Sequence, residues 1–140
     1  MARREHLDQL RNLRLFSACT NKELEQIARV TDEVSVDAGA RIVSQGDVAR
    51  EAFVVVEGTA AVVIGNDAVA QLGPGRHFGE LALLDGGPRT ANVEALTPMR
   101  LLVISRPAFL GLLDEHPGIA RRIMATMASL IRDLERPVGE

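Results

Sequence analysis

The sequence contains no Trp and no Tyr, and Phe occurs only four times. Proteins that hold single-stranded nucleic acid by stacking place several aromatic side chains on the binding face, so this composition argues against such a platform. Cys19 is the only cysteine. A single thiol excludes a disulfide within the chain and is typical of the reducing cytosol, so we expect a cytoplasmic protein.

Long apolar runs are missing as well. No run approaches the ~20 residues that a membrane-spanning helix needs, and the charged start, Met1 to Glu5, is not followed by the apolar core of a signal peptide. Basic charge is in deficit, because 16 Lys and Arg stand against 19 Asp and Glu, which gives a net charge of −3. We therefore expect neither a membrane partner nor DNA binding by this chain.

What is present fits one globular domain over residues 1–140, of which 46% are hydrophobic and 25% charged. Apolar residues at helical spacing predict helices within 1–31, where Thr20 to Glu23 has the form of a capping box. Short β-rich runs separated by Gly, Pro and Asn turns fill 32–105, and helical spacing returns over 106–136. The pattern predicts a mainly β architecture: helical entry, β-roll and C-terminal helix pair.

The two C-terminal helices have clear boundaries. Ser105 can cap the first helix, with Pro107 in its first turn, and the break at His116 is followed by Pro117, which opens the second helix. The second helix carries an apolar seam at alternating spacings of three and four: Ala120, Ile123, Met127, Leu130 and Leu134. This seam packs on its own β domain, joins a partner helix in a homodimer or an effector complex, or does both.

The segment from His77 to Ala91 interrupts the strands and carries the chemistry. Gly79 to Leu84 can make one helical turn, whose free N–H groups attract an anion. Glu80 supplies an acid at that turn, and Arg89 supplies a base after a Gly-Gly-Pro bend. A ligand with an anionic end and hydroxyls would use both side chains. From residue types alone, however, a glycine-flanked acid and a distant Arg more often form a surface salt bridge.

The order and spacing of this segment match a known pattern. Phe-Gly-Glu-Leu-Ala-Leu-Leu (78–84) followed by Pro-Arg-Thr-Ala (88–91) closely resembles the phosphate-binding cassette of the cyclic nucleotide-binding domain, which is shared by catabolite activators, cyclic-nucleotide-dependent kinases and cyclic-nucleotide-gated channels. Gln45 to Asp47, Phe53 to Gly58 and Ser105 to Phe109 match further parts of that family. The resemblance covers almost the whole chain and implies an eight-stranded antiparallel jelly roll, or double-stranded β-helix.

The resemblance also implies roles within the cassette, residues 78–91. Glu80 would accept a hydrogen bond from the ribose 2′-hydroxyl, and Arg89 would pair with the exocyclic oxygens of the cyclic phosphate. Thr90 would add its hydroxyl. The expected ligand-binding residues are Gly79, Glu80, Leu81, Ala82, Arg89, Thr90 and Ala91. No cofactor is expected besides the ligand itself.

The base is less constrained by the sequence. Thr90 permits adenine or guanine, and we expect cAMP rather than cGMP because bacteria-like members of the family usually use cAMP. The last helix usually covers the base, which makes Arg132, Leu134 and Glu135 the lid candidates. The catabolite activator has Thr-Ser where this chain has Leu134 and Glu135, so its adenine contacts are not reproduced here.

Two other kinds of function have some support in the sequence. Pro74 to Glu80 superficially resembles the metal motif of cupins, but His6, His77 and His116 are the only histidines and just one lies in the roll, so we expect no metal and no enzyme. A fold-alike interaction domain that does not respond to nucleotide is the alternative to a sensor that moves its C-terminal helices. Whether the chain is a full-length receptor or a fragment of a larger regulator stays open.

Overall fold

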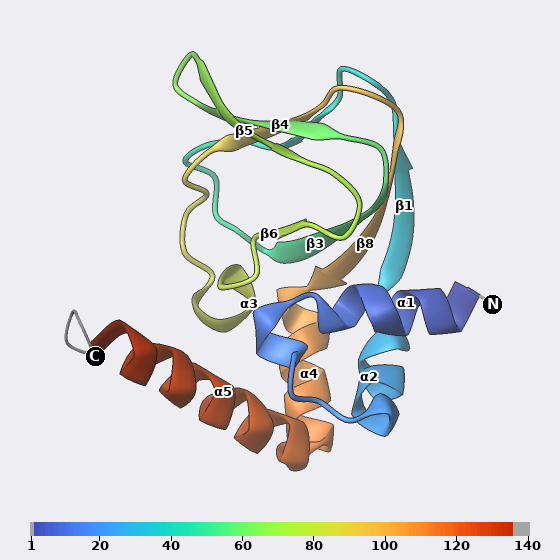
Figure 1. The fold of residues 1–140 in the computed structure, drawn as a ribbon, viewed down its shortest axis with the longest axis vertical. Coiled ribbons are helices and arrows are strands. Elements are labelled where there is room, and N and C mark those ends of the chain that lie inside the picture. Colours follow the sequence, from blue (N-terminus) through green and yellow to red (C-terminus); the bar gives the residue numbers. More distant parts are fainter. Residues whose placement is uncertain (1, 136–140) are drawn as a thin grey trace.

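The computed structural model describes the backbone of residues 2–135 and the side chains of residues 6–135. Figure 1 shows a β-roll on one side of the molecule and a layer of helices on the other. The eight strands are β1 (Asp32–Val36), β2 (Arg41–Val43), β3 (Glu51–Glu57), β4 (Ala60–Ile64), β5 (Asp67–Leu72), β6 (His77–Phe78), β7 (Asn92–Ala95) and β8 (Met99–Ser105). The mainly β architecture with flanking helices is therefore confirmed.

The strands form two four-stranded sheets, in the orders β1-β8-β3-β6 and β2-β7-β4-β5, and every pair is antiparallel. Strand β6 is absent from the sequence prediction, because two residues are too few to show a period. It forms because Phe78 lies opposite Phe53 and His77 opposite Val54 on β3. This short pairing carries the chain from the sheet directly into the cassette.

The helices begin where capping residues place them. They are α1 (Ala2–Arg11), the 3₁₀ turn η1 (Arg14–Phe16), α2 (Asn21–Ala28), α3 (Ala82–Asp85), α4 (Arg106–Glu115) and α5 (Pro117–Glu135). The predicted capping box is present: the Glu23 N–H donates to Thr20 Oγ1 at 3.1 Å, and the Thr20 N–H donates to Glu23 Oε1 at 2.8 Å. Ser105 likewise accepts from the Ala108 N–H at 3.2 Å. The predicted end of the last helix, at 136, lies outside the described residues.

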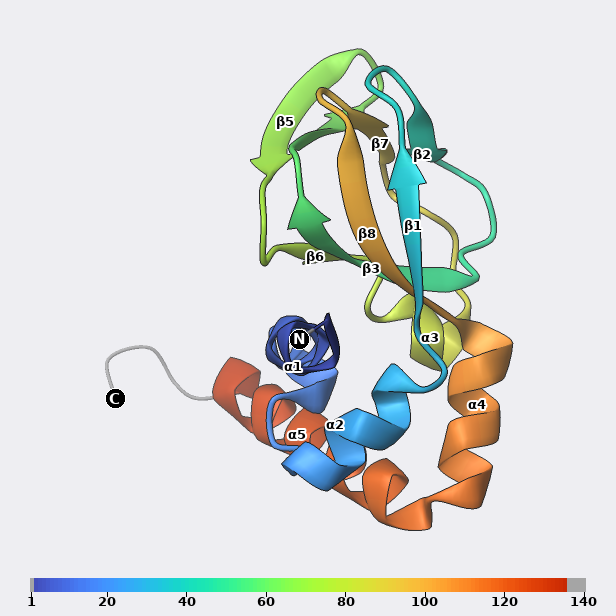
Figure 2. The ribbon, with the colours of Figure 1, turned by 90° about the vertical axis from the view of Figure 1, so that its right-hand side faces the viewer.

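Strand β3 contributes to two separate cores. Phe53 and Val55 face the interior of the roll, where they pack with residues of β7 and β8. Ala52, Val54 and Val56 face the opposite way and pack against the helices. Burial on both faces explains why this strand reads as a continuous apolar run rather than as an alternating one. Figure 2 shows α1 end-on between the roll and α2.

Helix α5 packs on its own domain through its first half. Ile119 and Ile123 are buried, and Arg122 Nε lies 2.7 Å from Glu23 Oε1 of α2. Beyond that point the seam opens to solvent, because Ile131 is 51% and Leu134 86% exposed. The start of the seam therefore packs on the domain's own helices, which is one of the arrangements that the sequence left open.

Gly58 makes a tight turn between β3 and β4 that provides a test of the fold. Its φ is +90°, and an added Cβ would overlap the Pro98 carbonyl oxygen. Gly39 has a similar φ of +86° but open space around it. We expect Gly39→Ala to lower the free energy of unfolding by about 1 kcal/mol, the cost of a left-handed backbone, and Gly58→Ala by about 2 kcal/mol more, from overpacking. Urea denaturation followed by circular dichroism measures both, and equal losses would contradict the packing described here.

Candidate ligand-binding site

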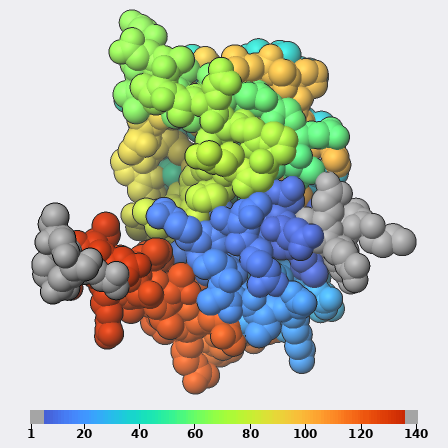
Figure 3. All heavy atoms as spheres, in the orientation of Figure 1, coloured from blue at the N-terminus to red at the C-terminus, as the bar shows by residue number. Residues whose placement is uncertain are grey.

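A pocket of about 540 Å³ opens in the roll beside the cassette. The space-filling view shows the hollow next to the yellow segment that carries the cassette (Figure 3). This volume is in the range of small-molecule sites. The lining residues are Arg14, Val43, Ala49, Val62, His77, Phe78, Gly79, Glu80, Leu81, Ala82, Asp85, Gly87, Pro88, Arg89, Thr90, Ala91 and Val93.

The structure brings all seven expected ligand-binding residues of the cassette to this pocket, Gly79 to Ala82 and Arg89 to Ala91. The three lid candidates do not join them: among the described residues, the lining includes none from α5. Leu134 is 86% exposed in the second half of that helix. In this arrangement of α5, Arg132, Leu134 and Glu135 therefore do not cover the pocket.

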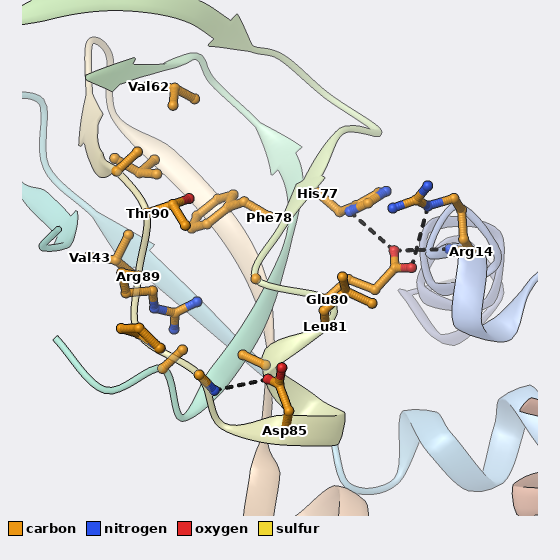
Figure 4. A pocket seen from close by; sticks show the side chains of 17 residues that line it. Arg14, Val43, Val62, His77, Phe78, Glu80, Leu81, Asp85, Arg89 and Thr90 are labelled. Atoms are coloured by element: carbon orange, nitrogen blue, oxygen red, sulfur yellow. Dashed lines mark hydrogen bonds and ion pairs between the residues drawn. The ribbon is translucent and has the colours of Figure 1, made fainter. Parts of the chain in front are cut away.

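The cassette turn forms the helix α3, which is shorter than expected and starts later. The Ala82 N–H donates to the Gly79 carbonyl at 3.1 Å, so this N–H is engaged within the turn. The helix ends at Gly86, whose φ of +64° is the left-handed conformation that glycine adopts readily. Asp85 accepts the Gly87 N–H at 2.9 Å and so fixes the bend that leads to Arg89 (Figure 4).

Arg89 is held in place by backbone groups rather than by an acid. Its own N–H donates to the Asp47 carbonyl at 2.8 Å, and its Nη2 donates to the Glu51 carbonyl at 2.9 Å. The guanidinium also lies 5.7 Å from the centroid of the Phe53 ring. Burial lowers the pKa of Arg89, and the charge of Glu51 opposes this shift. Because guanidinium pKa values start so high, the group stays cationic.

Gly79 lets Arg89 approach the cassette backbone. Its φ is +77°, and an added Cβ would overlap Nη1 of Arg89 and lie 2.8 Å from the Glu51 carbonyl oxygen. Any larger residue would displace the guanidinium from the pocket. The glycine that precedes Glu80 is therefore required by the position of Arg89.

Glu80 is 4% exposed and is directed away from Arg89 (Figure 4). Its Oε2 accepts the backbone N–H of Arg14 at 3.1 Å and lies 3.4 Å from Nδ1 of His77. Its Oε1 lies 3.6 Å from Nε of Arg14. The buried carboxylate thus has its cationic neighbours on the side of η1 and β6.

Sequence reasoning missed both of these neighbours. Arg14 lies 66 positions from Glu80, and nothing local marks it. His77 pairs with Val54 in β6 and faces Glu80, and no signal in the sequence marks either contact. Arg14 also lines the pocket, so Arg89 is joined by a second cation there.

The other end of the pocket is apolar. Phe78 stacks on Phe53 with ring centroids 4.7 Å apart, and the valines Val43, Val62 and Val93 complete the wall. Thr90 is the hydroxyl on this side (Figure 4). In the part of the chain that the structure describes, His, Cys, Asp and Glu side chains do not gather in groups of three that could hold a metal ion. The arrangement can bind a small molecule that has an anionic group and a flat apolar part.

A β-roll that encloses such a pocket and is flanked by helices defines a small-ligand-binding domain. Residues 33–116 match the family model of the cyclic nucleotide-binding domain. The chain belongs to the cyclic nucleotide-binding domain family, whose members serve as regulatory domains.

Individual relatives agree with this assignment. The chain is 38% identical over 112 residues to a cyclic nucleotide-gated potassium channel of Rhizobium etli, covering 80% of this chain and 31% of the channel. It is 33% identical over 122 residues to a cAMP-dependent protein kinase regulatory subunit of Colletotrichum orbiculare, covering 86% of this chain and 31% of the subunit. The chain thus spans less than a third of either protein.

Solved structures share the fold. The N-terminal domain of a transcriptional regulator from Streptomyces coelicolor superposes with a TM-score of 0.85 at 29% identity, covering 91% of this chain and 94% of that one. The regulatory domain of Toxoplasma gondii PKA with cAMP gives a TM-score of 0.70 at 26% identity, covering 91% of this chain and 49% of that one.

In residues 2–135, no helix combines the length and apolar character needed to cross a membrane.

The His77 environment gives a prediction that needs no ligand. Burial lowers the pKa of His77 below 6.5; the charge of Glu80 opposes this shift, and the cations Arg14 and Arg76 add to it. We expect NMR titration of the imidazole to give a pKa below 6.5, lower still in Glu80→Gln and higher in Arg14→Ala.

Arg29→Ala removes one exposed charge from the end of α2 and is the control for net charge. It should leave the His77 titration unchanged. A His77 pKa above 6.5 in the unsubstituted protein would contradict the burial and the charge arrangement described here.

Proposed function

We propose that this domain is a sensor that binds a cyclic mononucleotide, cAMP in preference to cGMP, and signals through its C-terminal helices. The observation that carries the proposal is the Arg89 guanidinium, held in the pocket beside Gly79 with no acid bound to its Nη2. The choice of adenine is supported by two relatives, a cAMP-dependent protein kinase regulatory subunit and a PKA regulatory domain solved with cAMP.

In this proposal the cyclic phosphate lies against Arg89. The side chain already donates one hydrogen bond to the Glu51 carbonyl, and this bond fixes the plane of the guanidinium before the ligand arrives. A fixed, partly desolvated cation binds a singly charged phosphate more strongly than an exposed one, because water screens the pair less. Neutral nucleosides should therefore bind poorly.

The rest of the nucleotide fits the remaining lining. The ribose would lie toward Glu80, and the base toward Phe78 and the valine wall. A hydrogen bond to a charged group contributes about 1.5–3 kcal/mol, and micromolar binding requires ~8 kcal/mol. Micromolar affinity is therefore consistent with two hydrogen bonds at Arg89, one at Glu80 and burial of the base, whose summed free energies reach this value.

Arg89→Ala tests the phosphate site. Loss of two charge-assisted bonds should weaken cAMP binding at least ~100-fold in isothermal titration calorimetry. Arg29→Ala, the control for net charge, should bind as the unsubstituted protein does, and circular dichroism should show that both variants are folded. A loss of less than tenfold in Arg89→Ala would mean that the phosphate site is elsewhere.

Glu80→Gln should weaken cAMP binding less than Arg89→Ala, because an amide oxygen still accepts a hydrogen bond from the ribose 2′-hydroxyl.

Contacts between elements support a path for the signal. Arg106, the first residue of α4, donates from Nη2 to the Leu84 carbonyl of α3 at 3.0 Å. At the far end of α4, His116 has φ −130° and ψ 74°, a non-helical joint before α5. A ligand that moves α3 would therefore move α4 and change the direction of α5. This requires that the ligand bind the domain more tightly with α5 in one direction than in the other.

Hydrogen exchange measures this transmission. On addition of cAMP we expect amides from Ile123 to Leu134 to gain protection together with those from Gly79 to Leu84, as α5 closes over the base. Arg89→Ala at the same cAMP concentration should show neither change. Protection confined to the cassette, with α5 unchanged, would mean that the domain binds nucleotide without signalling through that helix.

The exposed end of α5 supports a further part of the proposal. Met124, Ile131 and Leu134 are more than half exposed. A surface of this kind fits either a homodimer or an effector protein bound through the C-terminal helix, and the two share the same apolar chemistry. We propose no DNA contact for this surface, since the net charge of the chain is −3.

A further inference from the structure

The Glu80 carboxylate has an unused acceptor. Among the described residues, Glu80 is the only buried charged side chain, and its Oε1 has no hydrogen-bond partner. A buried acceptor without a donor is unfavourable, and a ligand hydroxyl would satisfy it. Oε2, in contrast, already accepts the Arg14 N–H.

Arg14 covers the unused oxygen. Its Nε lies 3.6 Å from Oε1, beyond hydrogen-bond distance, and the Arg14 side chain is 60% exposed. Because Nε is too distant to donate a hydrogen bond to Oε1 and the Arg14 side chain is mostly in solvent, a ligand hydroxyl that donates to Oε1 offsets the loss of this long ion pair. The backbone N–H of Arg14 cannot leave without moving η1. A hydroxyl that approaches Oε1 must therefore displace the side chain and can leave the turn in place.

His77 is the second group against the carboxylate. Its Nδ1 is buried, lies 3.4 Å from Oε2 and makes no hydrogen bond among the described residues. The charged groups that face it are Glu80, Arg14 of η1 and Arg76 of the turn before β6. On protonation the imidazolium would gain a charge-assisted bond to Oε2 and hold the carboxylate toward η1.

We propose that Arg14 and His77 form a gate over Glu80: the ribose hydroxyl reaches the carboxylate by displacing the Arg14 guanidinium, and protonated His77 holds the carboxylate in the closed arrangement. This inference rests on the proposed function. Both are positioning residues, because they act on the ligand through Glu80. The gate makes the ribose contribution to affinity dependent on pH, while the phosphate contribution at Arg89 is not.

A pair of ligands isolates the ribose hydroxyl. cAMP and 2′-deoxy-cAMP share the phosphate and the base, so the ratio of their dissociation constants reports only on the hydroxyl and Glu80. Arg14→Ala removes the covering guanidinium but keeps the backbone N–H. We expect it to raise the preference for cAMP over 2′-deoxy-cAMP by about two- to fivefold, because the hydroxyl no longer has to break the Arg14–Glu80 ion pair. Arg29→Ala should leave this preference unchanged.

The same ratio is measured between pH 5.5 and pH 8, a range that extends about 1 to 1.5 pH units to either side of an ordinary histidine pKa. Burial lowers the pKa of His77, so the imidazole is neutral over the upper part of this range and its charged fraction is largest at the lower end. The preference for cAMP should therefore fall on acidification in the unsubstituted protein. In His77→Gln it should not change with pH, because no titrating group then faces Oε2.

The outcomes separate the two proposals. An unchanged or lower preference for cAMP in Arg14→Ala would overturn the gate, as would an identical pH dependence in His77→Gln and in the unsubstituted protein. Either result would leave nucleotide binding intact. If neither ligand bound at any pH, the proposed function would fail, and the gate with it.

Discussion

The structure depends on strand β3, which is buried on both faces. Its Phe53 belongs to the core of the roll and its Val54 to the core under the helices. Its neighbours β8 and β6 pair along its two edges. The Glu51 carbonyl, at its start, accepts from Arg89. A single strand therefore joins the two cores and fixes the Arg89 guanidinium in the pocket. The guanidinium is thus anchored to the most deeply packed strand of the domain.

The two charged side chains of the cassette, Arg89 and Glu80, are held by different elements of the fold, and this keeps them apart. Arg89 is fixed by carbonyl oxygens and an aromatic ring, whereas Glu80 is held by Arg14 and His77 on its far side. If the acid and Arg89 paired with each other, each would neutralise the group that the ligand needs. Gly79 stands between them and allows the guanidinium to lie against the chain without touching the acid.

Local signals in the sequence were sufficient for much of this arrangement. The capping box at Thr20, the cap at Ser105 and the turns between strands act within a few residues, so spacing alone predicts them. The cassette is also contiguous, which is why seven candidate residues meet at one pocket. Arg14 and the two-residue strand β6 could not be predicted, because one depends on a contact across 66 positions and the other on pairing to β3. Whether the lid candidates Arg132, Leu134 and Glu135 reach the pocket depends on the direction of α5, and the apolar seam does not determine that direction.

The helical layer is connected to the pocket at two points, and the two connections differ in kind. Arg106 belongs to α4 and donates to the Leu84 carbonyl of the cassette helix, so under the proposed function it would transmit displacement of α3. Arg14 belongs to η1, whose Phe16 lies 6.0 Å from Phe109 of α4 between ring centroids. Under the proposed function, occupation of the phosphate end and of the ribose end would therefore reach the same helix through two different contacts. Because α4 is followed by the joint at His116, the direction of α5 would then depend on both ends, and a ligand that fills only one would move α5 less than a complete nucleotide.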